Sequence, residues 1–287
     1  GPRRGLAMSA RRVEIAALAR LDTREVLRSR WPVVTGLLYG IVALLFTFGA
    51  MRESSVLGFT GTGRVLMGFT HALVLLVPLL ALVAPAPTLN RAREDGSLEL
   101  LLGHPISPDG YYTAVTLVRL VLLLAPLALL LVSLPLVTRV AFGDPVRWAA
   151  IGRTLAVAAA LVWAFVGLGM ALSAYVAQSA KATILALLAW AAAVALLDFA
   201  LIGLMLQWRL QPAPLFLLAA VNPVQCARLA LLAGQAPELD AFGPIGFFLA
   251  QRLGSGGLLA LGLGWPALFG TLTWLAGRRR FRGGDLV

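Results

Sequence analysis

The sequence predicts an all-α, polytopic membrane protein with six transmembrane helices, and three observations support that prediction. Hydrophobic residues make up 60% of the 287-residue chain and charged residues 13%, against about 45 to 50% and about 25% in soluble domains. The apolar residues gather in runs too long for barrel strands, and in lipid such runs must be helical. The net charge of +11 lies mostly toward the two chain ends, which is typical of membrane topology. We therefore expect no nucleic-acid partner.

The apolar runs define the predicted transmembrane domain, residues 32–277. Each predicted span is counted against the roughly 20 apolar residues that cross the hydrocarbon. With the N-terminus in the cytoplasm, 15 of the 24 lysines and arginines fall in cytoplasmic segments and 8 in external ones, so both termini are expected inside the cell. In chain order, the spans are placed at residues 32–51, 65–89, 111–138, 149–176, 182–206 and 257–276.

The segment ahead of the first span, residues 1–31, predicts a helix. Arg20, Arg24 and Arg28 recur at every fourth position, while Asp22 interrupts the apolar face. We expect an interfacial helix that rests on anionic lipid headgroups. The alternative is a solvated basic tail. At the other end, residues 278–287 are interpreted as a cytoplasmic basic tail that anchors the last span.

The long external segment, residues 207–256, holds one predicted short helix. Asn222 and Pro223 suit the N-cap and first helical positions, and Gly234 suits the position after the end. We interpret the segment as helices on the outer leaflet that offer a docking face to an external partner. A re-entrant cap that only packs on the bundle is the alternative.

Several kinds of chemistry are missing from the sequence. The only lysine, Lys181, follows no glycine-rich loop, so the chain has no P-loop for ATP. Cys226 is alone, and His71 and His104 are predicted on opposite sides of the membrane, where they cannot share a metal. Met67 lies one turn before His71, so a soft-metal site there is the alternative to ordinary helix packing. We expect a chain that is not an enzyme and binds no metal or cofactor itself.

Two ionisable residues fall inside predicted spans, where such residues are functional candidates. Asp198 lies in the fifth span and Arg153 in the fourth, and these spans form a hairpin. An intramembrane ion pair between them is the first interpretation. A proton relay at Asp198, as in a proton-coupled secondary carrier, is the alternative from another functional class.

The cytoplasmic segment at residues 90–110 breaks the apolar pattern. Leu98, Leu101 and Leu102 fall at i, i+3 and i+4, which predicts a short helix with one apolar face and Glu99 on the other. Such a helix lies on the membrane or enters a groove on another protein. Acids beside an anionic inner leaflet favour the protein partner.

At these residues the chain resembles the ABC-2 permeases, which carry a segment like E-x-G-T-L-E-x-L-L-x-x-P-I-S between spans two and three. Ser97 takes the usual threonine place, and His104 after a glycine departs from the pattern. The resemblance implies a type V exporter-like fold with an N-terminal elbow helix. It also implies that the segment couples to a separate ATPase, which holds ATP and Mg²⁺, with two permease copies per two ATPases. The matching residues are Glu94, Gly96, Ser97, Leu98, Glu99, Leu101, Leu102, Pro105, Ile106 and Ser107.

Shorter matches resemble the branch of this family that serves maturation of nitrous oxide reductase. That branch implies a bacterial inner-membrane location and a periplasmic, β-helical, copper-handling partner. An ABC-2 exporter of a drug, lipid or sulfur species is the alternative, and a scaffold without a transport cycle is a third. The matches lie at residues 57–60, 76–79, 152–153 and 198, and at Asn222, Pro223, Arg228 and Leu229, which become the candidate external docking residues.

Overall fold

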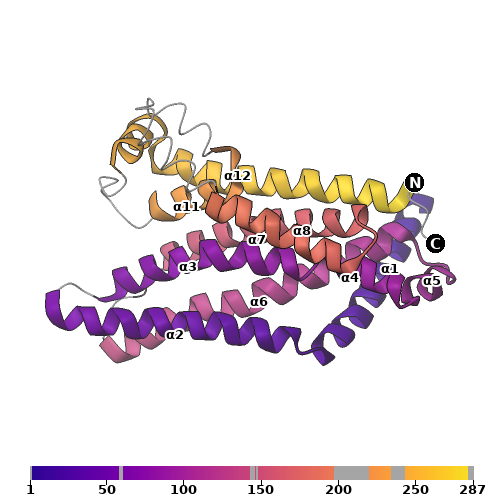
Figure 1. Ribbon diagram of the computed structural model, residues 1–287, viewed down its shortest axis with the longest axis horizontal. Helices are drawn as coiled ribbons and strands as arrows, with labels where there is room; N and C mark the ends of the chain where they lie inside the picture. The colour runs from indigo at the N-terminus through magenta and orange to yellow at the C-terminus, as the bar shows by residue number, and fades with distance from the viewer. Residues whose placement is uncertain are drawn as a thin grey trace.

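The computed structural model describes residues 2–57, 61–142, 146, 148–196, 220–233 and 243–283. Every element in this part of the chain is a helix. Figure 1 shows an elongated bundle with α1, α4 and α5 at one end, called here the α5 end, and α11 toward the other. The elements are α1 (Pro2–Arg28), α2 (Trp31–Leu57), α3 (Gly61–Val83), α4 (Thr88–Glu94), α5 (Ser97–Leu102), α6 (Pro108–Phe142), α7 (Trp148–Tyr175), α8 (Ser179–Ala191), the π-helical turn η1 (Ala192–Leu196), α11 (Pro223–Ala233) and α12 (Gly243–Gly283).

Four helical stretches are long and apolar enough to cross a membrane, and they correspond to the predicted second, third, fourth and sixth spans. The predicted first and fifth spans begin in shorter apolar helices, Trp31–Val42 and Ser179–Val194, as far as the described residues extend. A multi-pass membrane protein follows, while the count of six spans stays a prediction. The four long stretches are Ala72–Glu94, Pro108–Val137, Trp148–Tyr175 and Gly254–Gly283.

Several helices extend beyond the limits that the sequence predicted, and α6 and α12 do so at the site described below. α6 begins at Pro108, three residues before the predicted start of the third span. α12 continues to Gly283, through residues that the sequence analysis assigned to the basic tail. At Gly254, φ is 62° and the helix kinks, a left-handed backbone that glycine adopts without a steric penalty. The chain therefore enters the last span through a bend and leaves it as continuous helix.

Glycines allow α7 and α12 to approach closely. A Cβ atom added to Gly270 would lie 2.7 Å from Cα of Ala164, whereas Gly256 and Gly264 have open space around them. The repeat at Gly256, Ala260 and Gly264 predicts a close helix contact, but neither glycine makes one within this chain. Small residues let membrane helices pack backbone to backbone. In α12, Gly270 and Gly277 make such contacts with α7, and Gly262 makes them with α11.

Candidate functional site

The candidate site is the projection formed by α4, α5 and the turn between them. Gly96 has φ of 73° and starts α5 from a left-handed conformation. The Asp95 carboxylate accepts a hydrogen bond from the Ser97 amide at 2.9 Å. Hydrogen bonds from the hydroxyl and amide of Ser97 hold the pKa of Asp95 below its ordinary value. The turn is thus fixed by its own side chains, and α5 is the short helix that the sequence predicted.

The apolar face of α5 points into the protein. Leu98 is completely buried, and Leu101, Leu102 and Ile106 pack partly buried against the core. Leu100, on the opposite face, is 75% exposed. The spacing of the leucines predicts a partner-binding face on the leucine stripe that begins at Leu98. In the structure a partner cannot reach that side chain, because the stripe contacts the bundle.

Glu94 connects the projection to a distant helix. Its carboxylate accepts hydrogen bonds from the amide of Ser179 at 2.8 Å and from its hydroxyl at 2.7 Å. Ser179 is the first residue of α8, and its own N-cap residue, Gln178, makes no side-chain cap. A helix N-terminus has free amides and a partial positive charge. Glu94 therefore caps α8 from another part of the chain.

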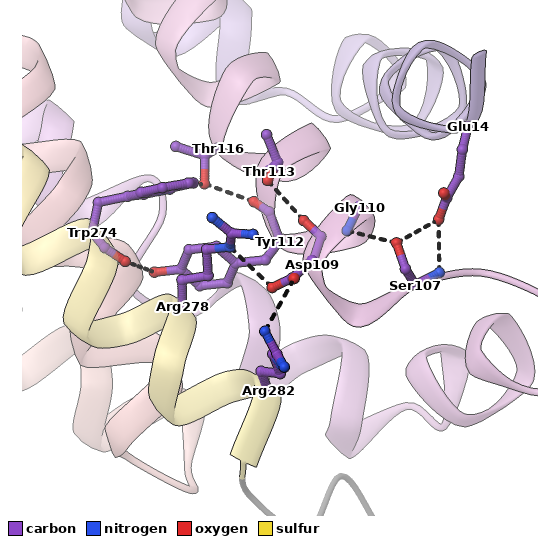
Figure 2. A network of polar contacts seen from close by, with 10 residues as sticks. All are labelled: Glu14, Ser107, Asp109, Gly110, Tyr112, Thr113, Thr116, Trp274, Arg278 and Arg282. Carbon is purple, nitrogen blue, oxygen red and sulfur yellow. Dashed lines mark hydrogen bonds and ion pairs between the residues drawn. The ribbon is translucent and has the colours of Figure 1, made fainter. Parts of the chain in front are cut away.

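Ser107 ends the projection and joins two helices (Figure 2). Its hydroxyl oxygen accepts a hydrogen bond from the Gly110 amide at 3.0 Å, which makes Ser107 the N-cap of α6. Its amide and hydroxyl donate to the Glu14 carboxylate of α1 at 2.7 and 2.8 Å. This cap explains the early start of α6. Glu14 stands in a helical pattern with no signal of its own, so the sequence did not predict this contact.

Asp109 ties the start of α6 to the end of α12 (Figure 2). Its carboxylate lies 2.9 Å from Nε of Arg278 and 3.9 Å from a guanidinium nitrogen of Arg282. Beside this pair, the Tyr112 hydroxyl donates to the Trp274 carbonyl at 3.4 Å. The last turns of α12 are therefore part of the α5 end.

A second anchor of α1 lies deeper along α6. The Arg119 guanidinium holds the Asp22 carboxylate at 2.6 and 3.2 Å, with both side chains nearly buried. Burial raises the pKa of Asp22, and the facing guanidinium opposes that rise. Arg20, Arg24 and Arg28 are exposed on the outer face of α1. Asp22, which interrupts the apolar face in the sequence, is thus the ion-pair partner of a charge in the third span.

The candidate docking residues of α11 divide into buried and partly buried ones. Asn222 and Pro223 are the N-cap and first residue of α11 as predicted, and both are buried. The Asn222 side chain accepts from the Val224 amide at 2.9 Å and donates to the Ala193 carbonyl of η1 at 2.5 Å. Arg228 and Leu229 are only partly buried. Asn222 therefore positions α11 through both of its hydrogen bonds.

Burial along α11 shows how this part of the external segment packs. Val224, Cys226 and Ala227 are completely buried, and a Cβ on Gly262 of α12 would lie 2.7 Å from the Cys226 carbonyl oxygen. A helix lying on the outer leaflet would expose such residues. In the described residues, α11 packs into the bundle as a cap.

The structure does not test the remaining candidate residues of the membrane spans. Arg153 is an exposed residue in the second turn of α7, and Asp198 lies outside the described residues, so their predicted pairing is not tested. His71 and Met67 lie in α3 at positions whose side chains are outside the described part. Within the described residues, no three His, Cys, Asp or Glu side chains come together to hold a metal ion.

The fold and this site define a class of protein: a multi-pass helical membrane protein with a short helix held out at one end. Residues 16–282 match the ABC-2 family transporter proteins, so the chain belongs to that family. It is 26% identical over 232 residues to the probable ABC transporter permease protein NosY of Stutzerimonas stutzeri. The match covers 79% of this chain and 84% of that relative.

Proposed function

We propose that this chain is the permease subunit of an ABC transporter and that α5 docks on a separate ATPase subunit. The observation that supports this most is the contrast between Leu98, completely buried, and Leu100, 75% exposed, on one turn of helix. An exposed leucine flanked by Glu99 and His104, both exposed, suits a partner's apolar groove with a polar rim. The docking face is therefore Glu99, Leu100, His104 and Pro105.

The contacts that anchor the projection to other helices would let it transmit motion to them. Glu94 holds α8, Ser107 holds α1, and Asp109 holds α12. A push on α5 then acts on several helices together, because each anchor is a charged group or a cap with short hydrogen bonds. Packed helices move as rigid bodies between discrete arrangements. The chain would so transmit motion that begins at the partner's nucleotide sites.

In this proposal catalysis belongs to the partner. ATP and Mg²⁺ are held by two ATPase subunits, and two copies of this chain form the membrane part. The α5 end faces the cytoplasm, with both termini on that side of a bacterial inner membrane. The excess of arginine in the segments assigned to the cytoplasm supports this orientation.

The finer proposal is a role in copper-site maturation of nitrous oxide reductase. It is supported by the similarity to the NosY permease, 26% over 232 residues, and by the short matches at Asn222, Pro223, Arg228 and Leu229. A periplasmic, β-helical, copper-handling protein would bind near the α11 end. Asn222 would fix the pose of α11, and the partly buried Arg228 and Leu229 would be nearest to the partner.

Paired substitutions in α5 test the docking role. The chain is co-expressed with its ATPase, purified in detergent, and assayed for the retained ATPase and for ATP hydrolysis. Leu100→Asp is expected to release the ATPase without lowering the melting temperature, because Leu100 is on the surface. Leu98→Ala is expected to lower stability by roughly 2 to 5 kcal/mol while the folded fraction still binds. Normal ATPase retention by Leu100→Asp would contradict the proposal.

The finer role has its own test. A bacterium that lacks this chain is complemented with wild type or Leu100→Asp, and the copper content of its nitrous oxide reductase is measured. Full copper loading without the chain would remove the maturation role and leave an exporter of a drug, lipid or sulfur species. Asp198→Asn addresses the carrier alternative, since proton-coupled transport that stops while ATP hydrolysis continues would favour it.

A further inference from the structure

A cluster of arginines lies beside α5, on residues that the docking face does not include. The last turns of α12, from Arg278 to Gly283, hold four arginines and no acid. Arg93 of α4 adds a fifth guanidinium, and the positive charges of Arg93 and Arg280 repel each other. Asp109 is the acid that pairs with this cluster, through Arg278 and Arg282. The cluster therefore carries an excess of positive charge.

Phe281 shows that the cluster is built into the fold and is not a loose tail. Its ring is 1% exposed and packs against Tyr111 and Tyr112, at centroid distances of 6.3 and 5.6 Å. The Arg93 guanidinium lies 5.7 Å from the centroid of the same ring, within the range of a cation–π contact. An aromatic residue held this way fixes the direction of its neighbours in the helix.

The neighbours so fixed point outward. Arg279 and Arg280 are exposed, and the Arg282 side chain is 73% exposed although it lies near Asp109. Like charges held close together by packing raise the free energy of the isolated chain, and an opposing acidic surface removes that cost. Planar guanidinium groups suit carboxylates well, because they can form two parallel hydrogen bonds.

The position of the cluster favours a protein partner over a lipid surface. Arg278 binds Asp109, which lies two residues after Ser107 at the end of the projection. Along the long axis of the molecule, Figure 1 shows the end of α12 near the position of α5. Both lie farther toward the α5 end than the first turn of α2. The end of α12 that carries the arginines thus lies beside the projection and apart from the start of the first predicted span.

We propose that Arg279 and Arg280 form a second docking surface, which binds a carboxylate-rich patch of the same ATPase subunit that receives α5. This inference rests on the proposed function. The α5 contact is apolar and sets the affinity through burial. The arginine contact is electrostatic and sets the approach rate and the orientation of the partner.

The experiment measures ATPase affinity in nanodiscs of phosphatidylcholine at 50 and 500 mM NaCl. Arg279→Glu/Arg280→Glu is expected to raise Kd about tenfold at low salt and less than about threefold at high salt, because salt screens exposed charges. The matched control, Arg20→Glu/Arg24→Glu, changes two exposed arginines of α1 and should stay within about twofold. Arg279→Gln/Arg280→Gln should show a smaller rise of the same sign. Reversing the facing acids of the ATPase to lysine should restore binding to the Glu variant.

The outcomes separate the two proposals. An unchanged Kd for the Glu variant, with binding still lost in Leu100→Asp, overturns the second surface and leaves the α5 docking intact. Failure of the wild-type chain to bind the ATPase overturns both. If the Glu variant keeps the wild-type Kd for the ATPase but no longer binds phosphatidylglycerol vesicles, the arginines bind lipid. That result also overturns the second surface.

Discussion

The Glu94 carboxylate accepts two hydrogen bonds from Ser179, 85 positions later in the chain, and caps the first turn of α8. The first acid of the family segment thus closes the gap between the projection and the turn that joins α7 to α8. Its neighbour Asp95 fixes the turn into α5 through Ser97. Some residues of the segment that resembles a docking motif therefore hold that segment in place.

Glu94→Ala should loosen this connection. The Ser179 amide loses its acceptor, and the amides of the first turn of α8, at residues 179–183, are expected to exchange hydrogen faster, since a helix N-terminus needs capping. Hydrogen exchange followed by mass spectrometry measures this. Ser179→Ala keeps the hydrogen bond from the backbone N–H of residue 179 to Glu94, so it should give a smaller increase in the exchange rate. Equal protection in Glu94→Ala and wild type would contradict the capping role.

Asp22→Leu should destabilise the protein by about 3 kcal/mol or more, because it leaves the Arg119 charge nearly buried without a partner. The double variant Asp22→Leu/Arg119→Met should recover much of that loss. Chemical unfolding in detergent gives both values. Glu25→Leu, an exposed acid on the same helix, is the control and should change stability by less than about 0.5 kcal/mol. Strictly additive losses would show that the pair is not coupled.

Gly270→Val should lower stability by about 1 to 3 kcal/mol, because the added carbons meet the backbone of Ala164 and Trp163 in α7. Gly264→Val adds the same atoms to the same helix at a position with open space. The melting temperatures of the two variants in one detergent should therefore differ clearly. Similar losses for both would mean that α7 and α12 do not pack through Gly270.

Asn222 offers a substitution that separates its two hydrogen bonds. Asn222→Asp keeps the oxygen that caps α11 and removes the amide that donates to Ala193. Asn222→Ala removes both and should cost about 0.5 to 2 kcal/mol for the cap alone, in addition to the loss at η1. We expect Asp to fall between wild type and Ala in thermal unfolding at pH 7. An Asp variant below Ala would indicate that charge repulsion at the Ala193 carbonyl outweighs the cap.

The sequence alone determined the membrane character, the short helix at Ser97–Leu102 and the cap at Asn222. These depend on local causes: long apolar runs, the spacing of three leucines, and an asparagine before a proline. The start of α6 also has a local cause, because the Ser107 hydroxyl accepts a hydrogen bond from the Gly110 amide, although the sequence did not predict this cap. A local cause therefore makes a feature accessible to sequence reasoning without ensuring that it is predicted.

Tertiary structure decided which face of α5 is outside, which charge Arg119 meets, and which glycines of α12 touch α7. Periodicity defines the faces of a helix, but it does not say what each face contacts. In a membrane protein this matters more, because lipid and protein core are both apolar, so a hydrophobic stripe does not mark the inside. Leu98 is completely buried and Leu100 is 75% exposed, and in the sequence both are leucines of one short run. In the folded chain Leu98 packs in the core, and nearby Glu94, Ser107 and Asp109 bind residues far away in the chain.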